Sequence, residues 1–421
     1  MGHAKEQWIR QTELGYGGVP DKTVCAECIS DYALKAFVRE EANENECSYC
    51  SREFDEPTAI ALVQLVDYIC ECIHTEWQDP VECMGWDGAE GGYQGASVYT
   101  GYELVMYHIE ELYDTDNMEL LEDIASSLGT SSWCQRDPYG LRDEEALIYS
   151  WEYFSNLVKH KVRYNFSRFD DEEQRKYDRD RTPVSKVLER IADEILGLGE
   201  CYGLIESIEK DCMIFRAMVH KKDEPLSTAK DLGTVPLDKA KYSNRMSPAG
   251  IPMFYGALDA ETAYQEVMDE TKDKKDKVVY IAAFKTLRPI TVLNLKNLPE
   301  VPSIFDRARN HLRSSIIFLR SFSREVSKPI SKDGFEHIAY VPTQVFTEYI
   351  RHFFKFGDHG SIDGISYPSS KHDGGVSCVL FIENEQCCDE IQTQLDEQDI
   401  RNAREPVKYL LLERVESRPL D

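Results

Sequence analysis

Four cysteines near the start of the chain form two CxxC pairs, Cys25 with Cys28 and Cys47 with Cys50, and eighteen residues separate the pairs. Each CxxC turn can place two thiolates on one cation, and four sulfur ligands in a tetrahedron suit zinc. Such a set leaves no position for a reactive water, so we expect a structural zinc ion. Ordinary thiols, a redox CxxC pair and an iron–sulfur cluster are weaker interpretations of this spacing.

Charged, aromatic and hydroxyl side chains that could form a second site lie in the C-terminal half. In chain order they are Arg216, Arg245, Tyr255, Glu266, Ser369 and Ser370. Taken singly, each has an ordinary structural explanation: a salt bridge, a core aromatic, the solvated face of a helix or a turn. Their significance therefore depends on the segments that carry them.

Three segments with these residues, 215–217, 244–266 and 363–370, together resemble RES domains, which are named for their Arg, Glu and Ser. The resemblance covers residues 212–384. RES domains share an architecture with ADP-ribosyltransferases and cleave NAD or transfer its ADP-ribose, so the resemblance implies an α+β fold with NAD as substrate. Two positions depart from the common pattern, because Asn244 replaces a frequent glycine and Met246 replaces a usual aromatic.

The resemblance also implies roles for the individual side chains. Breaking the nicotinamide–ribose bond builds positive charge on the sugar, and we expect the Glu266 carboxylate to stabilise it. Arginine suits the planar, charge-assisted recognition of a pyrophosphate, which is the role expected of Arg216 and Arg245. Tyr255 is expected to stack on the cationic nicotinamide, and Ser369, with Ser370 as an alternative, to hydrogen-bond the ligand.

Short β-rich runs must position these residues. The sequence predicts strands at 213–219, 253–257, 278–284, 290–295, 378–383 and 407–413, with helices at 260–269 and 305–324. Segment 336–344 is a candidate lining of the cleft and fits a strand, a turn and the start of a helix. We therefore expect an α+β catalytic domain over residues 206–421.

The region between the cysteines and this domain is predicted to be mainly α. Apolar residues recur at helical spacing from Pro57 to Trp77, and again over 104–128 and 144–162. With the two CxxC pairs, it resembles the HEPN-like N-terminal domain found fused to RES domains. The Arg-x4-6-His motif of HEPN ribonucleases is absent, so a regulatory or assembling role is expected. The predicted boundaries are 1–55 for the zinc knuckle and 56–205 for the helical domain.

The charge of the chain restricts its partners. The formal net charge is −28 for 421 residues, so most of the surface should repel a phosphate backbone, and broad nucleic-acid binding is not expected. The sequence contains neither a stretch long enough to span a bilayer nor the apolar core of a signal peptide, which predicts a cytoplasmic protein without membrane partners.

These features predict an NAD glycohydrolase that acts as a toxin-like or defence effector by depleting NAD. Mono-ADP-ribosyl transfer to a protein is the first alternative. The second is a zinc-bearing, nucleotide-sensing interaction protein with a degenerate RES domain. The sequence leaves open whether an antitoxin or another regulatory protein restrains the enzyme and whether the chain forms a homo-oligomer.

Overall fold

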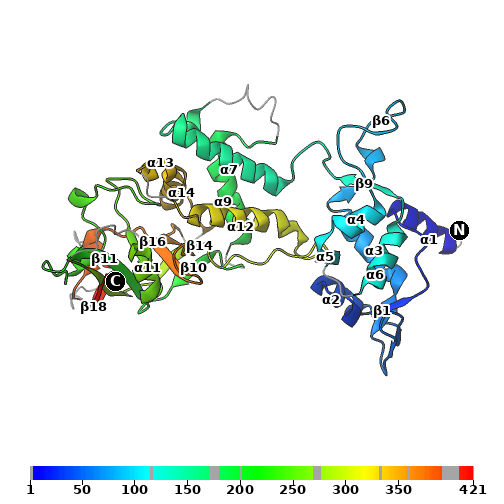
Figure 1. The fold of residues 1–421 in the computed structure, drawn as a ribbon, viewed down its shortest axis with the longest axis horizontal. Coiled ribbons are helices and arrows are strands. Elements are labelled where there is room, and N and C mark those ends of the chain that lie inside the picture. Colours follow the sequence, from blue (N-terminus) through cyan, green and yellow to red (C-terminus); the bar gives the residue numbers. More distant parts are fainter. Residues whose placement is uncertain are drawn as a thin grey trace. The chain divides into compact units, whose positions relative to one another are not determined.

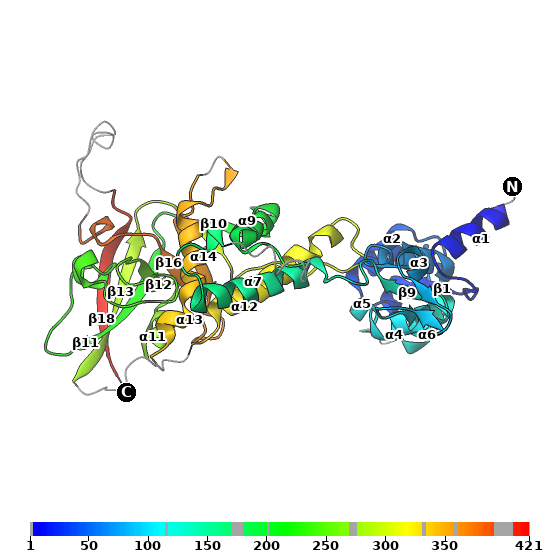
Figure 2. The ribbon, with the colours of Figure 1, turned by 90° about the horizontal axis from the view of Figure 1, so that it is seen from above.

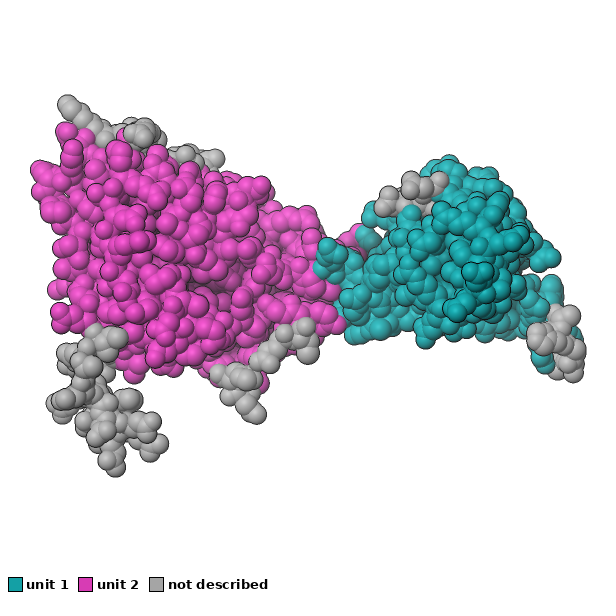
Figure 3. Space-filling model, turned by 90° about the horizontal axis from the view of Figure 1, so that it is seen from below, with its two compact units in different colours: residues 1–143, 300–314 teal, residues 144–299, 315–421 magenta. Residues whose placement is uncertain are grey.

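The structure is a computed structural model, and it describes residues 3–113, 117–169, 180–199, 202–268, 276–330, 334–357, 360–390 and 407–420. The chain divides into two compact units, which Figures 1 and 3 show. Unit 1 contains residues 1–143 and 300–314, and unit 2 contains residues 144–299 and 315–421. None of the described helices has the length and apolar character that crossing a bilayer requires.

Unit 1 packs short helices and small sheets around one apolar core. Its helices are α1 (His3–Glu13), α2 (Tyr32–Glu40), α3 (Leu62–Ile73), α4 (Gly101–Tyr107), α5 (Glu110–Tyr113) and α6 (Met118–Leu128). Its strands are β1 (Thr23–Cys25), β2 (Glu46–Cys47), β3 (Arg52–Glu53), β4 (Ala59–Ala61), β5 (Trp77–Gln78), β6 (Trp86–Asp87), β7 (Gly92–Tyr93), β8 (Tyr99–Thr100) and β9 (Ser132–Gln135). Helix α3 is amphipathic and buries Leu65, Val66 and Ile69 in this core.

Segment 300–314 belongs to unit 1, although its neighbours in the sequence belong to unit 2. Ile304 and Phe305 are buried in the core of unit 1. The Arg313 guanidinium donates to Glu76 over 3.1 Å and to Glu111 over 2.8 Å. The core of unit 1 is therefore completed by a segment that follows it by more than 150 positions.

Unit 2 is built on a nine-stranded mixed sheet with the order β10-β14-β15-β16-β12-β11-β13-β18-β17. The strands are β10 (Ile205–Ile208), β11 (Met213–Lys221), β12 (Phe254–Ala257), β13 (Lys277–Thr286), β14 (Ile290–Asn294), β15 (Gly364–Pro368), β16 (Val376–Leu380), β17 (Cys387–Cys388) and β18 (Leu410–Pro419). Neighbouring strands are antiparallel except for the parallel pairs β14 with β15 and β17 with β18.

Helices accompany this sheet in unit 2. They are α7 (Asp143–His160), α9 (Val187–Leu198), α10 (Ala229–Leu232), α11 (Ala260–Met268), α12 (Arg313–Ser327), α13 (Glu336–Ala339) and α14 (Val341–His352). Figures 1 and 2 show α7 beside α12, and the rings of Trp151 and Phe322 meet there at 5.0 Å between centroids. Helix α11 packs against β11, β12 and β13.

Several elements differ from the sequence-based expectations. The two compact units divide at residue 143, where α7 begins and packs with α12 in unit 2, whereas the boundaries at 55/56 and 205/206 stay predictions. The helix expected from Pro57 begins at Leu62, after β4. The strand expected within 336–344 is wrong: this segment forms α13 and the start of α14, with Pro342 in the first turn, where its missing N–H has no cost.

Candidate functional site

Unit 2 contains two adjoining hollows, of about 290 Å³ and about 1080 Å³, which are lined by five of the predicted site residues: Arg216, Arg245, Tyr255, Glu266 and Ser370. Both hollows are lined by Tyr242, Asn244, Tyr255, Glu266 and Tyr367, so they form one continuous cleft. These side chains come from β12, α11, β15 and the loop that precedes β12. The size is that of a pocket for a small organic ligand, about 300–1,000 Å³.

Glu266 lies on α11 and lines both hollows. Its Oε1 accepts hydrogen bonds from the hydroxyl of Ser369 at 2.6 Å and from that of Ser377 at 2.7 Å. Among the described residues, no hydrogen bond is made to Oε2. The two hydroxyls therefore orient the carboxylate while one oxygen stays available to a ligand.

Local structure explains why Glu266 has this position. The carboxylate of Asp259 caps the start of α11, because it accepts from the backbone N–H and the hydroxyl of Thr262 at 2.7 and 2.6 Å. The Thr262 hydroxyl also contacts His372 Nδ1 at 2.8 Å. The helix and the loop after β15 are thus tied together, and Glu266 faces the serine carried by that loop.

Arg216 lies in the middle of β11, opposite Ala282 of β13, and lines the smaller hollow. It is only 9% exposed. One guanidinium nitrogen donates to the Tyr255 carbonyl at 2.7 Å, whereas the buried Nε has no hydrogen-bond partner. Burial lowers the Arg216 pKa, and no described carboxylate forms an ion pair with it. A buried cation without a counter-ion is costly, so an anionic ligand would be stabilised here.

Arg245 lines the larger hollow. Its guanidinium donates to the Val326 carbonyl at 2.9 Å and lies 5.9 Å from the centre of the Tyr340 ring. Its backbone carbonyl accepts a hydrogen bond from the Thr343 hydroxyl. The two arginines predicted to bind phosphate therefore line different hollows of the same cleft, and each is anchored by a backbone carbonyl.

Tyr255 lies on β12 at the junction of the two hollows. Its hydroxyl accepts from the Met246 backbone N–H at 3.2 Å and contacts the Ser247 hydroxyl at 2.9 Å. Burial raises the pKa of this phenol to about 12. The turn that departs from the common RES pattern at Met246 thus supplies a backbone donor that fixes the ring.

The structure separates the two candidate serines. The Ser369 hydroxyl donates to Glu266 and accepts from the backbone N–H groups of Lys371 and His372 at 3.1 and 3.2 Å. Ser370 lines the larger hollow, whereas within the described chain Ser369 lines neither. Ser369 therefore orients the carboxylate of Glu266, whereas Ser370 lines the cleft.

Ser377 and Tyr367 are cleft residues that were not predicted from the sequence. Ser377 on β16 is 3% exposed, lines the smaller hollow and donates to Glu266. Tyr367 on β15 lines both hollows, and burial raises its pKa well above the usual value for tyrosine. Tyr367 lies within the third RES-like segment, and Ser377 follows it closely. Tyr367 and Ser377 are paired across the antiparallel strands β15 and β16, so both reach the cleft. The register of these two strands cannot be read from the composition of the sequence.

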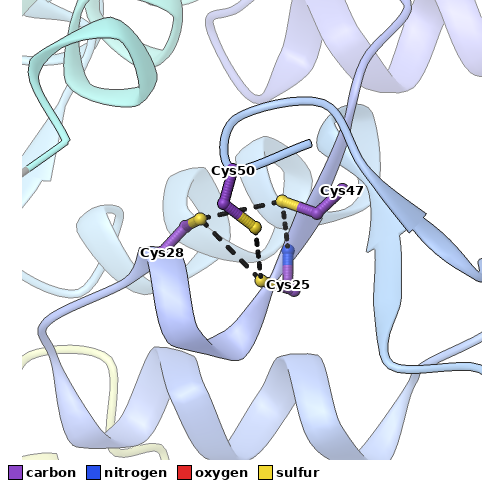
Figure 4. Close-up of side chains that lie close together, drawn as sticks. All are labelled: Cys25, Cys28, Cys47 and Cys50. Atoms are coloured by element: carbon purple, nitrogen blue, oxygen red, sulfur yellow. Dashed lines mark hydrogen bonds between the residues drawn. The ribbon is translucent and has the colours of Figure 1, made fainter. Parts of the chain in front are cut away.

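The four cysteines of the N-terminal pairs form a compact cluster in unit 1, with their sulfur atoms turned toward one another (Figure 4). Cys25 ends β1, Cys28 ends the following 3-10 turn, and Cys47 and Cys50 lie on the hairpin of β2 and β3. Of the His, Cys, Asp and Glu side chains that the structure describes, these four are the group arranged to hold a metal ion.

The spacing of the sulfur atoms fits a tetrahedral cation. The sulfur–sulfur distances are 3.8 Å for Cys25 with Cys28, 3.7 Å for Cys25 with Cys50 and 3.7 Å for Cys28 with Cys47. Zinc–sulfur bonds of about 2.3 Å in a tetrahedron place the sulfurs about 3.8 Å apart. Burial raises the pKa of Cys25 to about 11, so a cation is needed to hold this thiol as a thiolate.

Comparison with known families assigns both halves of the chain. Residues 40–172 match the HEPN/RES N-terminal domain 1, and residues 214–403 match the RES domain. Searches of curated proteins and of solved structures gave no match. A RES domain indicates an enzyme that acts on NAD and is linked to toxin activity. The chain is therefore a RES-domain protein with a HEPN/RES N-terminal domain.

Proposed function

We propose that the protein is an NAD glycohydrolase that cleaves the nicotinamide–ribose bond and acts as a toxin-like or defence effector by depleting NAD. The observation that carries this proposal is that Arg216 and Glu266 line the same hollow. A buried guanidinium without a counter-ion favours an anionic ligand, and a carboxylate held by two hydroxyls favours a ligand that develops positive charge. NAD has both features, in its pyrophosphate and in its reacting ribose.

The reaction breaks the bond between the ribose C1′ and the nicotinamide nitrogen. The bonding electron pair leaves with nicotinamide and neutralises the charge of its ring, while the sugar becomes cationic. Glu266 Oε2 faces this charge and stabilises it, and the Tyr255 ring supports the nicotinamide by stacking. Water then adds to C1′ and releases a proton, which gives ADP-ribose.

The first test is turnover of NAD by the full-length protein, with nicotinamide and ADP-ribose measured by chromatography. We expect Glu266→Gln to lower kcat by roughly 10²- to 10⁴-fold, because the glutamine keeps the shape and loses the charge. Glu261→Gln is the matched control: it makes the same change on the same helix, at a side chain that pairs with Arg418. Absence of turnover in the wild-type protein, or equal turnover in both variants, would overturn the proposal.

Two alternative functions give different outcomes in the same experiment. If the protein transfers ADP-ribose to a side chain, label from adenine-labelled NAD remains on protein after denaturation. If the RES domain senses a nucleotide without reacting, NAD binds with equal affinity to wild type and Glu266→Gln and no product forms. We expect free ADP-ribose, with nicotinamide released in equal amount.

We also propose that the four-cysteine cluster holds a structural zinc ion. The residues that would hold it are Cys25, Cys28, Cys47 and Cys50. When bound, zinc would stabilise the fold and take no part in catalysis, because four protein sulfurs fill its coordination sphere. The cluster fixes the hairpin of β2 and β3 to the turn after β1, and through the pairing of β1 with β4 to the start of α3.

A further inference from the structure

Unit 1 contains the same order of elements twice, although β1 pairs with β4 in the first copy whereas β5 and β8 both pair with β9 in the second. The first copy runs from β1 through a 3-10 turn, the hairpin β2–β3 and β4 to α3. The second runs from β5 through a 3-10 turn, the hairpin β6–β7 and β8 to α4. The order of strand, turn, hairpin, strand and helix is identical, although the first copy carries α2 as an insertion before its hairpin.

Backbone hydrogen bonds fix the correspondence between the two hairpins. The Ser51 N–H donates to the Cys47 carbonyl at 2.8 Å, and the Gly91 N–H donates to the Asp87 carbonyl at 2.8 Å. Both donor residues have positive φ, 55° for Ser51 and 74° for Gly91. In the turns, the Ile29 N–H donates to the Ala26 carbonyl, just as the Cys83 N–H donates to that of Pro80.

This correspondence places an acidic residue at the position of each cysteine in the cluster. In the order Cys25, Cys28, Cys47 and Cys50, the equivalents are Asp79, Glu82, Asp87 and Glu90. All four acidic residues are exposed, whereas the cysteines are buried or half-buried. The carboxylates of Asp79 and Asp87 accept from the backbone N–H groups of Val81 and Ala89. The second copy therefore has exposed carboxylates at the positions where the first copy has clustered cysteines.

Exposed aromatic side chains accompany these carboxylates. Trp86 is 62% exposed, and its ring meets the edge of the Tyr93 ring at 5.0 Å between centroids. Tyr139 is 59% exposed, and its hydroxyl donates to the Gln94 carbonyl at 3.0 Å. We call the surface formed by the hairpin β6–β7, the preceding turn at 79–83 and Tyr139 the acidic hairpin. An exposed tryptophan on the same surface as four exposed carboxylates is typical of a binding site.

Charge decides what this surface can bind. From Glu53 to Gln135 the chain has eighteen aspartates and glutamates and neither lysine nor arginine. Lysines and arginines from outside this stretch form ion pairs with six of these carboxylates, but within the described residues none pairs with Asp79, Glu82, Asp87 or Glu90. Such a field repels nucleic acids and anionic membranes and attracts cations. Exposed tryptophan and tyrosine rings add a preference for Lys and Arg side chains through cation–π contacts. A second copy of this chain, with net charge −28, would be repelled over most of its surface.

We propose that the acidic hairpin docks a segment rich in lysine and arginine from a partner protein. The carboxylates pair with the basic side chains, and Trp86 provides an apolar and cation–π contact at the centre of the surface. All residues of the acidic hairpin lie in unit 1, so this docking does not depend on the NAD chemistry of unit 2. It assigns to the second copy of the repeat a recognition role in place of metal binding.

The test measures binding of a fluorescent peptide of alternating arginine and glycine to the full-length protein by anisotropy. We expect Trp86→Ala to weaken binding about two- to fivefold, as the loss of one exposed cation–π contact predicts. Trp8→Ala, which removes another exposed tryptophan of unit 1, should have no effect. The double variant Asp87→Asn/Glu90→Gln should weaken binding by a similar or larger factor and should reduce its dependence on salt.

A charge-matched control separates a local surface from a general attraction. Asp55→Asn/Glu56→Gln removes the same charge from exposed residues that follow the first hairpin. If this control weakens binding as much as Asp87→Asn/Glu90→Gln, or if Trp86→Ala and Trp8→Ala behave alike, the proposal is wrong. Self-association of the chain that is lost in Trp86→Ala, measured by sedimentation without peptide, would also overturn it in favour of a second copy.

Discussion

The cysteine cluster of unit 1 and the cleft of unit 2 are both gatherings of polar side chains, but they are held together in opposite ways. In the cluster, the four sulfurs contact mainly one another, so the proposed zinc ion would be what holds them together. In the cleft, the protein itself holds each functional side chain: Glu266 by two serines, Tyr255 by the turn at Met246 and Ser247, and Arg245 by a backbone carbonyl.

This difference teaches how each site is prepared for its task. A structural metal site needs only ligands that close around the ion, and the fold is stabilised when the ion binds. A catalytic cleft must hold its charges in place before the substrate arrives, because reorganisation during the reaction would cost rate. Substitutions at the cluster should therefore act mainly on stability, and those in the cleft mainly on catalysis.

Removing one sulfur from the cluster should have the largest effect. We expect Cys47→Ser to lose the zinc and to destabilise unit 1 by several kcal/mol, since zinc binding contributes about 10–16 kcal/mol in isolated zinc-finger peptides. Metal analysis of the purified protein and thermal unfolding measure the two consequences. Cys83→Ser, at a half-buried cysteine of the same unit, should retain the metal. A Cys47→Ser protein with one zinc per chain and wild-type unfolding would contradict the prediction.

Removing a hydroxyl that holds Glu266 should have a moderate effect on catalysis and little on folding. We expect Ser369→Ala and Ser377→Ala each to lower kcat by about two- to tenfold, because the net energy of one hydrogen bond corresponds to such a factor. KM should be nearly unchanged. Ser369→Thr keeps the hydroxyl and should restore most of the rate.

Ser370→Ala provides the matched control for that comparison. Ser370 lines the larger hollow and carries no hydrogen bond to Glu266 within the described residues, so its loss should affect KM more than kcat. If Ser370→Ala lowers kcat more than Ser369→Ala does, the assignment of Ser369 as the positioning serine fails.

The smallest expected effect is a pH dependence of stability from Tyr255. Its pKa is about 12 in the folded protein and about 10 when unfolded. Between these values the folded state retains a proton that the unfolded state has lost, so the free energy of unfolding falls as pH rises. Tyr255→Phe has no phenol to ionise at this position, so its free energy of unfolding does not show this fall. The difference in free energy of unfolding between wild type and Tyr255→Phe should therefore narrow by about 1 kcal/mol between pH 9 and pH 11.

Urea unfolding at both pH values measures this change. Tyr242→Phe, which alters a tyrosine that is 83% exposed, is the control and should keep a constant offset from wild type. A deficit of Tyr255→Phe that stays constant or widens with pH would show that burial of the phenol is not what opposes its ionisation.

The sequence predicted the cysteine cluster more completely than it predicted the cleft, for a physical reason. All four cysteines lie within residues 25–50, and CxxC spacing is a local property of the chain. The cleft joins residues from 216 to 377, and its assembly depends on strand register. The RES-like segments named Glu266 and Arg216 as candidates, but the contact of Ser377 with Glu266 arises only when β16 lies beside β15.

Long-range packing also explains what the sequence did not show. Periodicity identified the helix at 144–162, which lies within the match to the HEPN/RES N-terminal domain, but a local pattern does not reveal that Trp151 packs on Phe322 in unit 2. The apolar run at 338–341 is compatible with a strand. It forms helices because α14 buries Val341, Phe346 and Ile350 along one face, so tertiary packing outweighs local propensity.

The last strand of the sheet has a practical consequence for dissecting the protein. The match to the RES domain ends at residue 403, but β18 lies beyond it and pairs along the whole of β13, from Val278 with Pro419 to Thr286 with Leu410. A fragment trimmed at the family boundary would leave one edge of β13 unpaired, while β11 still pairs with its other edge. Exposed edges of this kind recruit other chains, so such a fragment should aggregate before its enzymology could be measured.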